Sequence, residues 1–163
     1  MLIKVKNKDT LVVDDFIFKC CVGKKGLNKN KIEGDNSTPR GLFSLGKLYY
    51  RSDRVNKPET KLKIKKLNKS MGWSIDSKSR TYNSEIKINN KIKHEKLFRR
   101  DYKYDFFIPI KYNWTNSTLR KGSAIFIHLT KNFKSTAGCI ALAEKDFLIL
   151  VKLIKRSTKI KIL

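Results

Sequence analysis

Short stretches in which apolar and polar residues alternate set the strongest limit on how this chain can fold. The alternation runs through residues 2–5, 11–22, 61–67 and 159–163. Successive side chains of a strand point to opposite faces, so each stretch is expected to form a strand with one buried face. Segment 143–155 instead carries apolar residues at helical spacing, and a shorter helix is predicted over 94–100. The 163 residues therefore predict one mainly β domain, 1–163, with a few α-helices.

Other segments complete this outline. Residues 42–50 and 104–112 are predicted strands, and Pro109 is expected to move part of the second to an edge or a bulge. Residues 23–41 are predicted to be a long polar loop, whose end, 35–41, either lines a substrate cleft or makes a plain turn. Trp73 is expected to lie in the core.

The stretch 122–142, GSAIFIHLTKNFKSTAGCIAL, holds the candidate chemistry. His128 ends an apolar run predicted to be a buried strand, and Cys139 follows Gly138 after a polar loop. A hairpin-like return would bring Cys139 beside His128. A thiol nucleophile needs such a base to take its proton, or to hold it as a thiolate–imidazolium pair. The alternative is a buried structural Cys and a strand-end His without catalytic function.

Gly138 suggests a second element of such a site. A residue without Cβ lets the backbone turn sharply and approach a substrate closely. The N–H groups of Gly138 and Cys139 are therefore candidate donors to the oxygen of an acyl intermediate.

These residues resemble the active-site signature of the L,D-transpeptidase catalytic family (YkuD-like), which has a His, a spacer and then Ser/Thr-His-Gly-Cys. Here the last four are 136–139, Thr-Ala-Gly-Cys. Residues 34–43, GDNSTPRGLF, look like the Thr-Pro-x-Gly-x-Phe turn of that family. Weaker matches fall in the order expected for a short branch of the family: Gly72-Trp73, Tyr82-Asn83, His94-Glu95, Tyr104-Asp105 and Tyr112-Asn113.

The resemblance implies a sheet-rich catalytic core and a cysteine-dependent acyl transfer that crosslinks peptidoglycan stem peptides. Cys139 would be the nucleophile and His128 its base. With water as the acceptor, the same site would be an L,D-carboxypeptidase or endopeptidase. A non-catalytic basic protein that binds nucleic acid or the cell wall is the alternative of another class. We expect no cofactor and no metal, because no Cys/His cluster has metal-ligand spacing.

Candidate substrate-binding residues are Thr136, Arg40, Tyr112 and Asn113. Arg40 is chosen because its planar guanidinium suits a carboxylate, although Asn113 could simply make a turn. Two departures from the family pattern affect substrate recognition. Ala137 replaces the His before Gly-Cys, and Ala141 replaces an Arg that is thought to hold a substrate carboxylate.

The chain is strongly basic, with 38 Lys and Arg against 14 Asp and Glu and a net charge of +24. Such a charge favours an anionic partner, and stem peptides carry carboxylates. A bias toward Lys, Asn and Ile would also follow from an AT-rich genome. Nucleic acid is not the expected partner, since no RNA-binding motif or recognition helix is evident.

The three Cys residues do not form a disulfide framework. Of the neighbours Cys20 and Cys21, one is expected in the core and the other toward solvent.

The family implies the periplasm or cell envelope. Residues 1–15 contain no signal-peptide apolar region, and no stretch is long enough for a membrane span, so a cytoplasmic location stays open as an expectation. A monomer is expected.

Overall fold

The computed structural model describes all residues, 1–163, and consists mainly of one large curled sheet. Its strands follow the order β6-β15-β1-β2-β3-β14-β13-β12-β7-β8. The pairs β1–β15, β13–β14 and β7–β8 are parallel, and the remaining neighbours are antiparallel. The strands of this sheet are β1 (Leu2–Lys6), β2 (Thr10–Val13), β3 (Phe16–Cys21), β6 (Gly41–Ser44), β7 (Leu48–Tyr50), β8 (Ile64–Lys66), β12 (Phe106–Pro109), β13 (Phe126–Leu129), β14 (Ile140–Leu142) and β15 (Lys159–Ile162).

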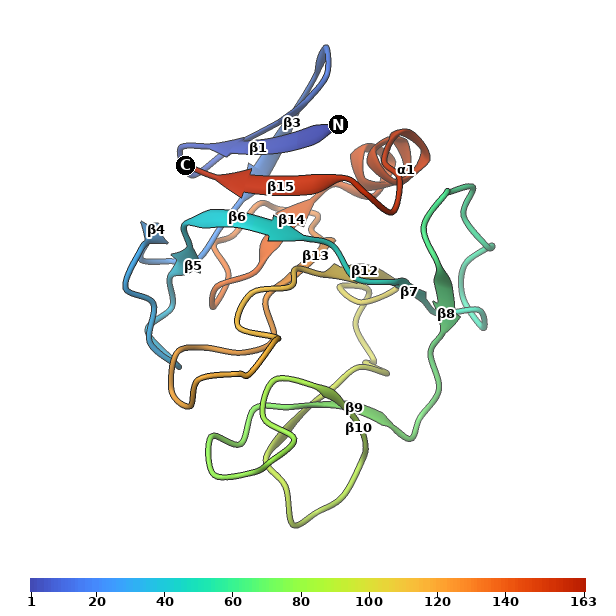
Figure 1. Ribbon diagram of the computed structural model, residues 1–163. Helices are drawn as coiled ribbons and strands as arrows, with labels where there is room; N and C mark the ends of the chain where they lie inside the picture. Colours follow the sequence, from blue (N-terminus) through green and yellow to red (C-terminus); the bar gives the residue numbers. More distant parts are fainter.

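Two smaller sheets flank it. One has the order β10-β9-β11, made of β10 (Glu85–Lys87), β9 (Met71–Ser74) and β11 (His94–Lys96). It lies at the end of the molecule opposite the two termini (Figure 1). The other pairs β4 (Leu27–Asn28) with β5 (Thr38–Pro39) inside the segment predicted to be a long loop.

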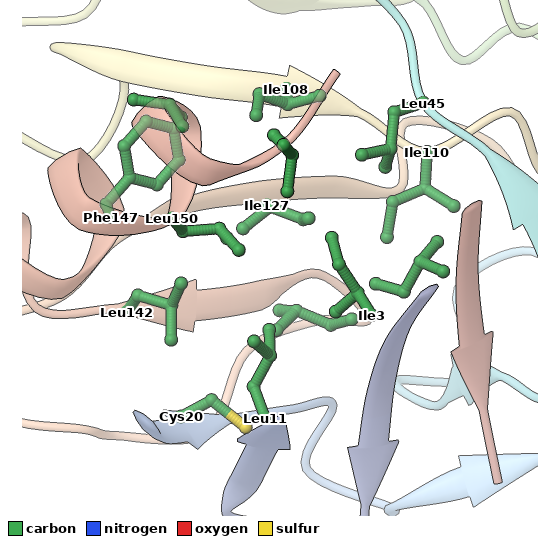
Figure 2. Packing of buried hydrophobic residues seen from close by; sticks show 14 of the residues in the cluster. Ile3, Leu11, Cys20, Leu45, Ile108, Ile110, Ile127, Leu142, Phe147 and Leu150 are labelled. Carbon is green, nitrogen blue, oxygen red and sulfur yellow. The ribbon is translucent and has the colours of Figure 1, made fainter. Parts of the chain in front are cut away.

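The main core lies between the two halves of the curled sheet and the helix α1 (Glu144–Leu153). Figure 2 shows Ile3 and Leu11 from β1 and β2 facing Ile127 of β13, with Phe147 of α1 closing one side. All four side chains are fully buried. Burial of each such side chain contributes about 1.5–3 kcal/mol, so this packing is the main force holding the halves together.

The helix α1 confirms the prediction for 143–155. It begins directly after β14 and buries Phe147, Leu150 and Val151. Acidic Glu144 and Asp146 lie in its first turn and basic Lys152 in its last turn, which complements the helix dipole. The helix therefore supports β13 and β14 from the core side.

A second apolar cluster lies on the opposite face of β12 and β13. Along these strands Ile108 and Ile127 face the main core, whereas Phe107 and Phe126 face the second cluster. Trp73 belongs to this cluster and is only 2% exposed, which confirms its predicted place in the core. This aromatic layer forms the base on which the candidate site is built.

Several local predictions were wrong. Residues 94–96 form β11 instead of a helix, because Glu95 pairs with Trp73 across the small sheet, and α1 is the only helix. Residues 42–50 split into two strands, β6 and β7. Pro109 ends β12, which lies inside the sheet and not at its edge, and it pairs with Phe126. The alternative of a bulge is confirmed, because the antiparallel register changes by one residue between the pairs Phe107–Tyr49 and Ile110–Leu45.

Cys20 and Cys21 also differ from expectation, because both are buried. Cys20 faces the main core, and Cys21 donates from Sγ to the carbonyl oxygen of Lys134 at 3.2 Å. Both thiols are free, as is that of Cys139.

Candidate active site

Strand alternation places Cys139 and His128 on the same face of the sheet. On β13, Ile127 and Leu129 enter the main core, so His128 points to the other side. On β14, Ile140 and Leu142 do the same, which leaves Cys139 on the side of His128. The apolar residues that surround the two candidates thus fix where their side chains point.

The two strands are parallel, not joined by the hairpin-like return that the sequence suggested. His128 is paired with Ala141, and Cys139 lies two residues earlier, just before β14 begins. The intervening loop is held at Thr136, whose N–H donates to Val22 and whose carbonyl oxygen accepts from Lys24, both at 2.9 Å. This loop runs beside the end of β3 before it turns into Cys139.

Cys139 and His128 line one cleft of about 440 Å³. Basic and acidic side chains surround them. The basic residues are Lys31, Arg99, Lys103 and Lys134, and the acidic ones are Glu33 and Glu95. A cleft of this composition suits a substrate that carries both carboxylates and ammonium groups.

Cys139 has no hydrogen bond to His128 in this structure. Its Sγ donates to the carbonyl oxygen of Ala124 at 3.3 Å and accepts from the N–H of Phe126 at 3.4 Å. Burial, followed by the charge of Glu95, raises the pKa of the thiol to about 12. The thiol is therefore protonated near neutral pH.

His128 is oriented by a backbone carbonyl. Its Nδ1 lies 2.9 Å from the carbonyl oxygen of Leu129. Because that oxygen only accepts, Nδ1 carries the proton and Nε2 keeps its lone pair. Burial lowers the pKa of His128 to about 4, and the cations Lys103 and Arg99 act in the same direction. The imidazole is thus a neutral base, and the Leu129 carbonyl is the orienting group that the sequence did not reveal.

Gly138 occupies a conformation that requires glycine. Its φ is +148°, and a Cβ there would lie 2.9 Å from the carbonyl oxygen of Ser37. Its N–H donates to Thr136 Oγ1 at 3.0 Å, which differs from the expectation that this amide is available to an oxyanion. The N–H of Cys139 makes no such bond, so the candidate oxyanion donor is reduced to that one amide.

Of the four residues predicted to bind substrate, only Thr136 lines the cleft. Its hydroxyl, however, donates to the Cys139 carbonyl oxygen at 2.6 Å and so shapes the turn. Arg40 is exposed and lines a separate pocket with Lys6 and Lys8. From the loop before Arg40, the residues that line the cleft are Lys31, Glu33, Gly34 and Asn36. Of the predicted segment 35–41, only Asn36 is among them.

Tyr112 and Asn113 do not line the cleft either. Asn113 has a φ of +52° and donates from its side-chain amide to the carbonyl oxygens of Thr118 and Gly122, both at 3.0 Å. Tyr112 donates to the Lys121 carbonyl oxygen at 2.6 Å. The turn interpretation of Asn113 is therefore the one that the structure supports.

Glu95 and Tyr104 are two further cleft residues that were not predicted as part of the site. The hydroxyl of Tyr104 donates to the carboxylate of Glu95, and the ring packs edge-on against His128 with centroids 5.5 Å apart. Burial raises the pKa of Glu95. Both residues lie in the pairs His94-Glu95 and Tyr104-Asp105 that carried the family resemblance, which was the available signal.

Comparison with known proteins identifies the family of this chain. The family model of the L,D-transpeptidase catalytic domain (YkuD) matches residues 2–162. The chain therefore belongs to the YkuD family, as the sequence motifs predicted. No curated protein matches it.

A solved structure shares the fold. It is the helical cell shape determining protein Pgp2 from Campylobacter jejuni, which is 19% identical with a TM-score of 0.51. The match covers 99% of this chain and 46% of that chain, so the present chain spans about half of that protein.

Two further observations concern metals and membranes. No group of three or more His, Cys, Asp or Glu side chains is arranged to hold a metal ion. The single helix lacks the length and apolarity of a membrane-crossing segment.

Proposed function

We propose that this chain is a cysteine-dependent L,D-transpeptidase that acts on peptidoglycan stem peptides in the cell envelope. The observation that carries the proposal is the placement of Cys139 and His128 on one face of neighbouring strands, in one cleft, with Nε2 of His128 free to accept a proton. Membership of the family supports the reaction class.

In the proposed first step, Sγ of Cys139 attacks the carbonyl carbon that joins the L-centre of the donor diamino acid to D-Ala. The thiol proton passes to Nε2 of His128 as the C–S bond forms. Because the resting thiol and imidazole are both neutral, this transfer accompanies the attack and does not precede it. The N–H of Cys139 stabilises the oxyanion, and D-Ala leaves with the proton from His128.

In the second step, an amine of an acceptor stem attacks the thioester. His128 takes a proton from the amine and returns it to the Cys139 sulfur as the C–S bond breaks. If water attacks instead, the product is a hydrolysed stem peptide.

We propose that cations of the cleft, and not Arg40, bind the carboxylates of the substrate. Lys31 forms an ion pair with Asp35 at 2.8 Å, and Arg99 with Asp101 at 2.6 Å. Lys103 and Lys134 line the cleft without an ion pair, so they are the cations available to a ligand. Lys103→Gln and Lys134→Gln should therefore raise KM more than they lower kcat.

The test is the intact mass of the protein after incubation with a carbapenem, which acylates active members of this family. Wild type should gain one adduct, whereas Cys139→Ala should gain none and His128→Ala should react far more slowly. Cys21→Ala is the matched control and should keep the adduct. Cys21 lies on β3, donates to the carbonyl oxygen of Lys134 and does not line the cleft.

Incubation with disaccharide-tetrapeptides then separates the two reactions. Crosslinked dimers would identify a transferase, and free tripeptides alone would identify a hydrolase. Folded wild type that forms no adduct and no product would overturn the assignment.

A further inference from the structure

A second pocket of about 620 Å³ shares no lining residue with the Cys139 cleft. Its apolar surface comes from Leu45, Leu62, Tyr49, Trp73 and Trp114. This volume lies within the range of small-ligand sites, which are mostly apolar with a few polar groups. It has no part in the acyl transfer proposed above.

Four cations from separate parts of the chain surround this pocket. They are Lys47, Lys63, Lys111 and Arg156. All four are exposed, and none of them forms an ion pair. Like charges gathered at a concave surface create a positive potential that attracts an anion.

The acidic residue of the pocket does not offset these charges. Glu85 accepts from the hydroxyl of Tyr49 at 2.6 Å and from Nζ of Lys65 at 2.5 Å. Its carboxylate is therefore already occupied, and the excess of positive charge remains available to a ligand.

The pocket also has a rigid aromatic wall. Trp114 stacks on Trp73 with ring centroids 5.6 Å apart and an interplanar angle of 18°. Trp73 is fixed by a hydrogen bond from Nε1 to Asn83 Oδ1 at 3.0 Å. Gly46 lets Trp114 approach, since a Cβ there would lie 3.2 Å from its ring, and Lys111 lies 5.4 Å from the ring centroid.

The basic surface continues beyond the pocket. A neighbouring hollow shares Lys47, Lys63 and Arg156 with it and adds Lys57. Its other two charged residues are already in ion pairs, Lys65 with Glu85 and Glu59 with Lys152. A surface that extends in this way suits a ligand with several units better than a single small ion.

We propose that this pocket binds an anionic saccharide, with one sugar ring against Trp114 and its carboxylate or phosphate between Lys63, Lys111 and Arg156. A sugar ring presents an apolar face to an aromatic side chain, and the cations would pair with its anionic group. Single-stranded nucleic acid fits less well. Successive bases stack on several rings, whereas Trp73 is only 2% exposed and leaves Trp114 as the one accessible tryptophan.

Tryptophan fluorescence can measure saccharide binding, because the two Trp residues of the chain both line this pocket. N-acetylmuramic acid serves as the carboxylated probe and N-acetylglucosamine 1-phosphate as the phosphorylated one. Neutral N-acetylglucosamine and an oligodeoxythymidine are the comparison ligands. At least one anionic sugar should change the fluorescence saturably. The sugar that binds more tightly shows whether the pocket prefers a carboxylate or a phosphate.

Lys111→Gln and Arg156→Gln should each weaken that binding about tenfold, since each removes a charged partner. Lys145→Gln, an exposed change on α1, should leave it unchanged. The carbapenem adduct at Cys139 should persist in all three variants. A failure of saccharide binding would therefore appear in the fluorescence alone, whereas a failure of the proposed function would appear in the adduct mass. Equal binding of the neutral sugar, no response to either anionic sugar, or tighter binding of the oligodeoxythymidine would overturn the proposal.

Discussion

The hydroxyl of Thr38 donates a hydrogen bond to the carbonyl oxygen of Gly138 at 2.8 Å, across one hundred residues of sequence. The same hydroxyl accepts from the N–H of Gly23 at 2.8 Å, and Thr38 is fully buried. One side chain thus joins the Thr-Pro turn, the end of β3 and the residue before the candidate nucleophile. The two motifs that carried the family resemblance meet at this contact.

Thr38→Val should therefore both destabilise the protein and displace Cys139. The substitution keeps the shape but leaves the Gly23 N–H and the Gly138 carbonyl unpaired, at a cost of about 1–3 kcal/mol. Denaturant unfolding should show this loss, and carbapenem acylation should slow. Thr10→Val is the control, because the Thr10 hydroxyl makes only an exposed bond to neighbouring Asp9. Equal stability of the two variants would contradict the role of Thr38.

Gly138→Ala should be more damaging than the same change at another glycine with positive φ. At Gly138 the backbone conformation alone costs about 1–3 kcal/mol, and the new Cβ also meets the Ser37 carbonyl oxygen. At Gly34, with a φ of +77°, a Cβ has no atom within 4 Å. Thermal unfolding of both variants measures the difference, and a larger loss at Gly34 would show that the Ser37 contact is unimportant.

Glu95→Gln should make Cys139 more reactive toward iodoacetamide at a fixed pH near 8. The negative charge of Glu95 contributes to the raised pKa of the thiol, so its removal lowers that pKa and increases the thiolate fraction. Alkylation followed by peptide mass mapping gives the rate at Cys139. Glu59→Gln, which changes an exposed carboxylate paired with Lys152, should leave the rate unchanged. A slower rate in Glu95→Gln would mean that the carboxylate activates the thiol.

Stability should fall as the pH is lowered from about 6.5 to about 4, and His128 should account for part of the loss. The pKa of His128 falls from 6.5 to about 4 in the folded protein. In this window the unfolded chain binds a proton that the folded protein does not, so the free energy of unfolding rises with pH and drops on acidification. Denaturant unfolding curves of wild type and His128→Gln, recorded at several pH values, measure this change in the free energy of unfolding. The variant should lose less stability between pH 6.5 and pH 4, and parallel losses would show that His128 does not titrate as described.

Much of the architecture could be predicted from local sequence. The alternation of apolar and polar residues predicted β1 and β15, and helical spacing predicted α1. The pair Gly138-Cys139, which follows the apolar run that ends in His128, predicted the candidate site. These features are short-range, because side-chain period and glycine conformation depend on neighbouring residues. The helix expected over 94–100 failed for the opposite reason. Pairing with β9 overrode the local preference and placed the Glu95 carboxylate where it accepts a hydrogen bond from the Tyr104 hydroxyl.

The sequence by itself determined the mainly β class, the helix α1 and the two residues, Cys139 and His128, that we propose for the acyl transfer. Tertiary structure alone decided what surrounds them. The parallel pairing of β13 and β14, the Leu129 carbonyl that orients His128, and the placement of Arg40 outside the cleft depend on contacts between distant segments. Such contacts are set by burial and strand register across the whole sheet, and no local pattern of residues encodes them.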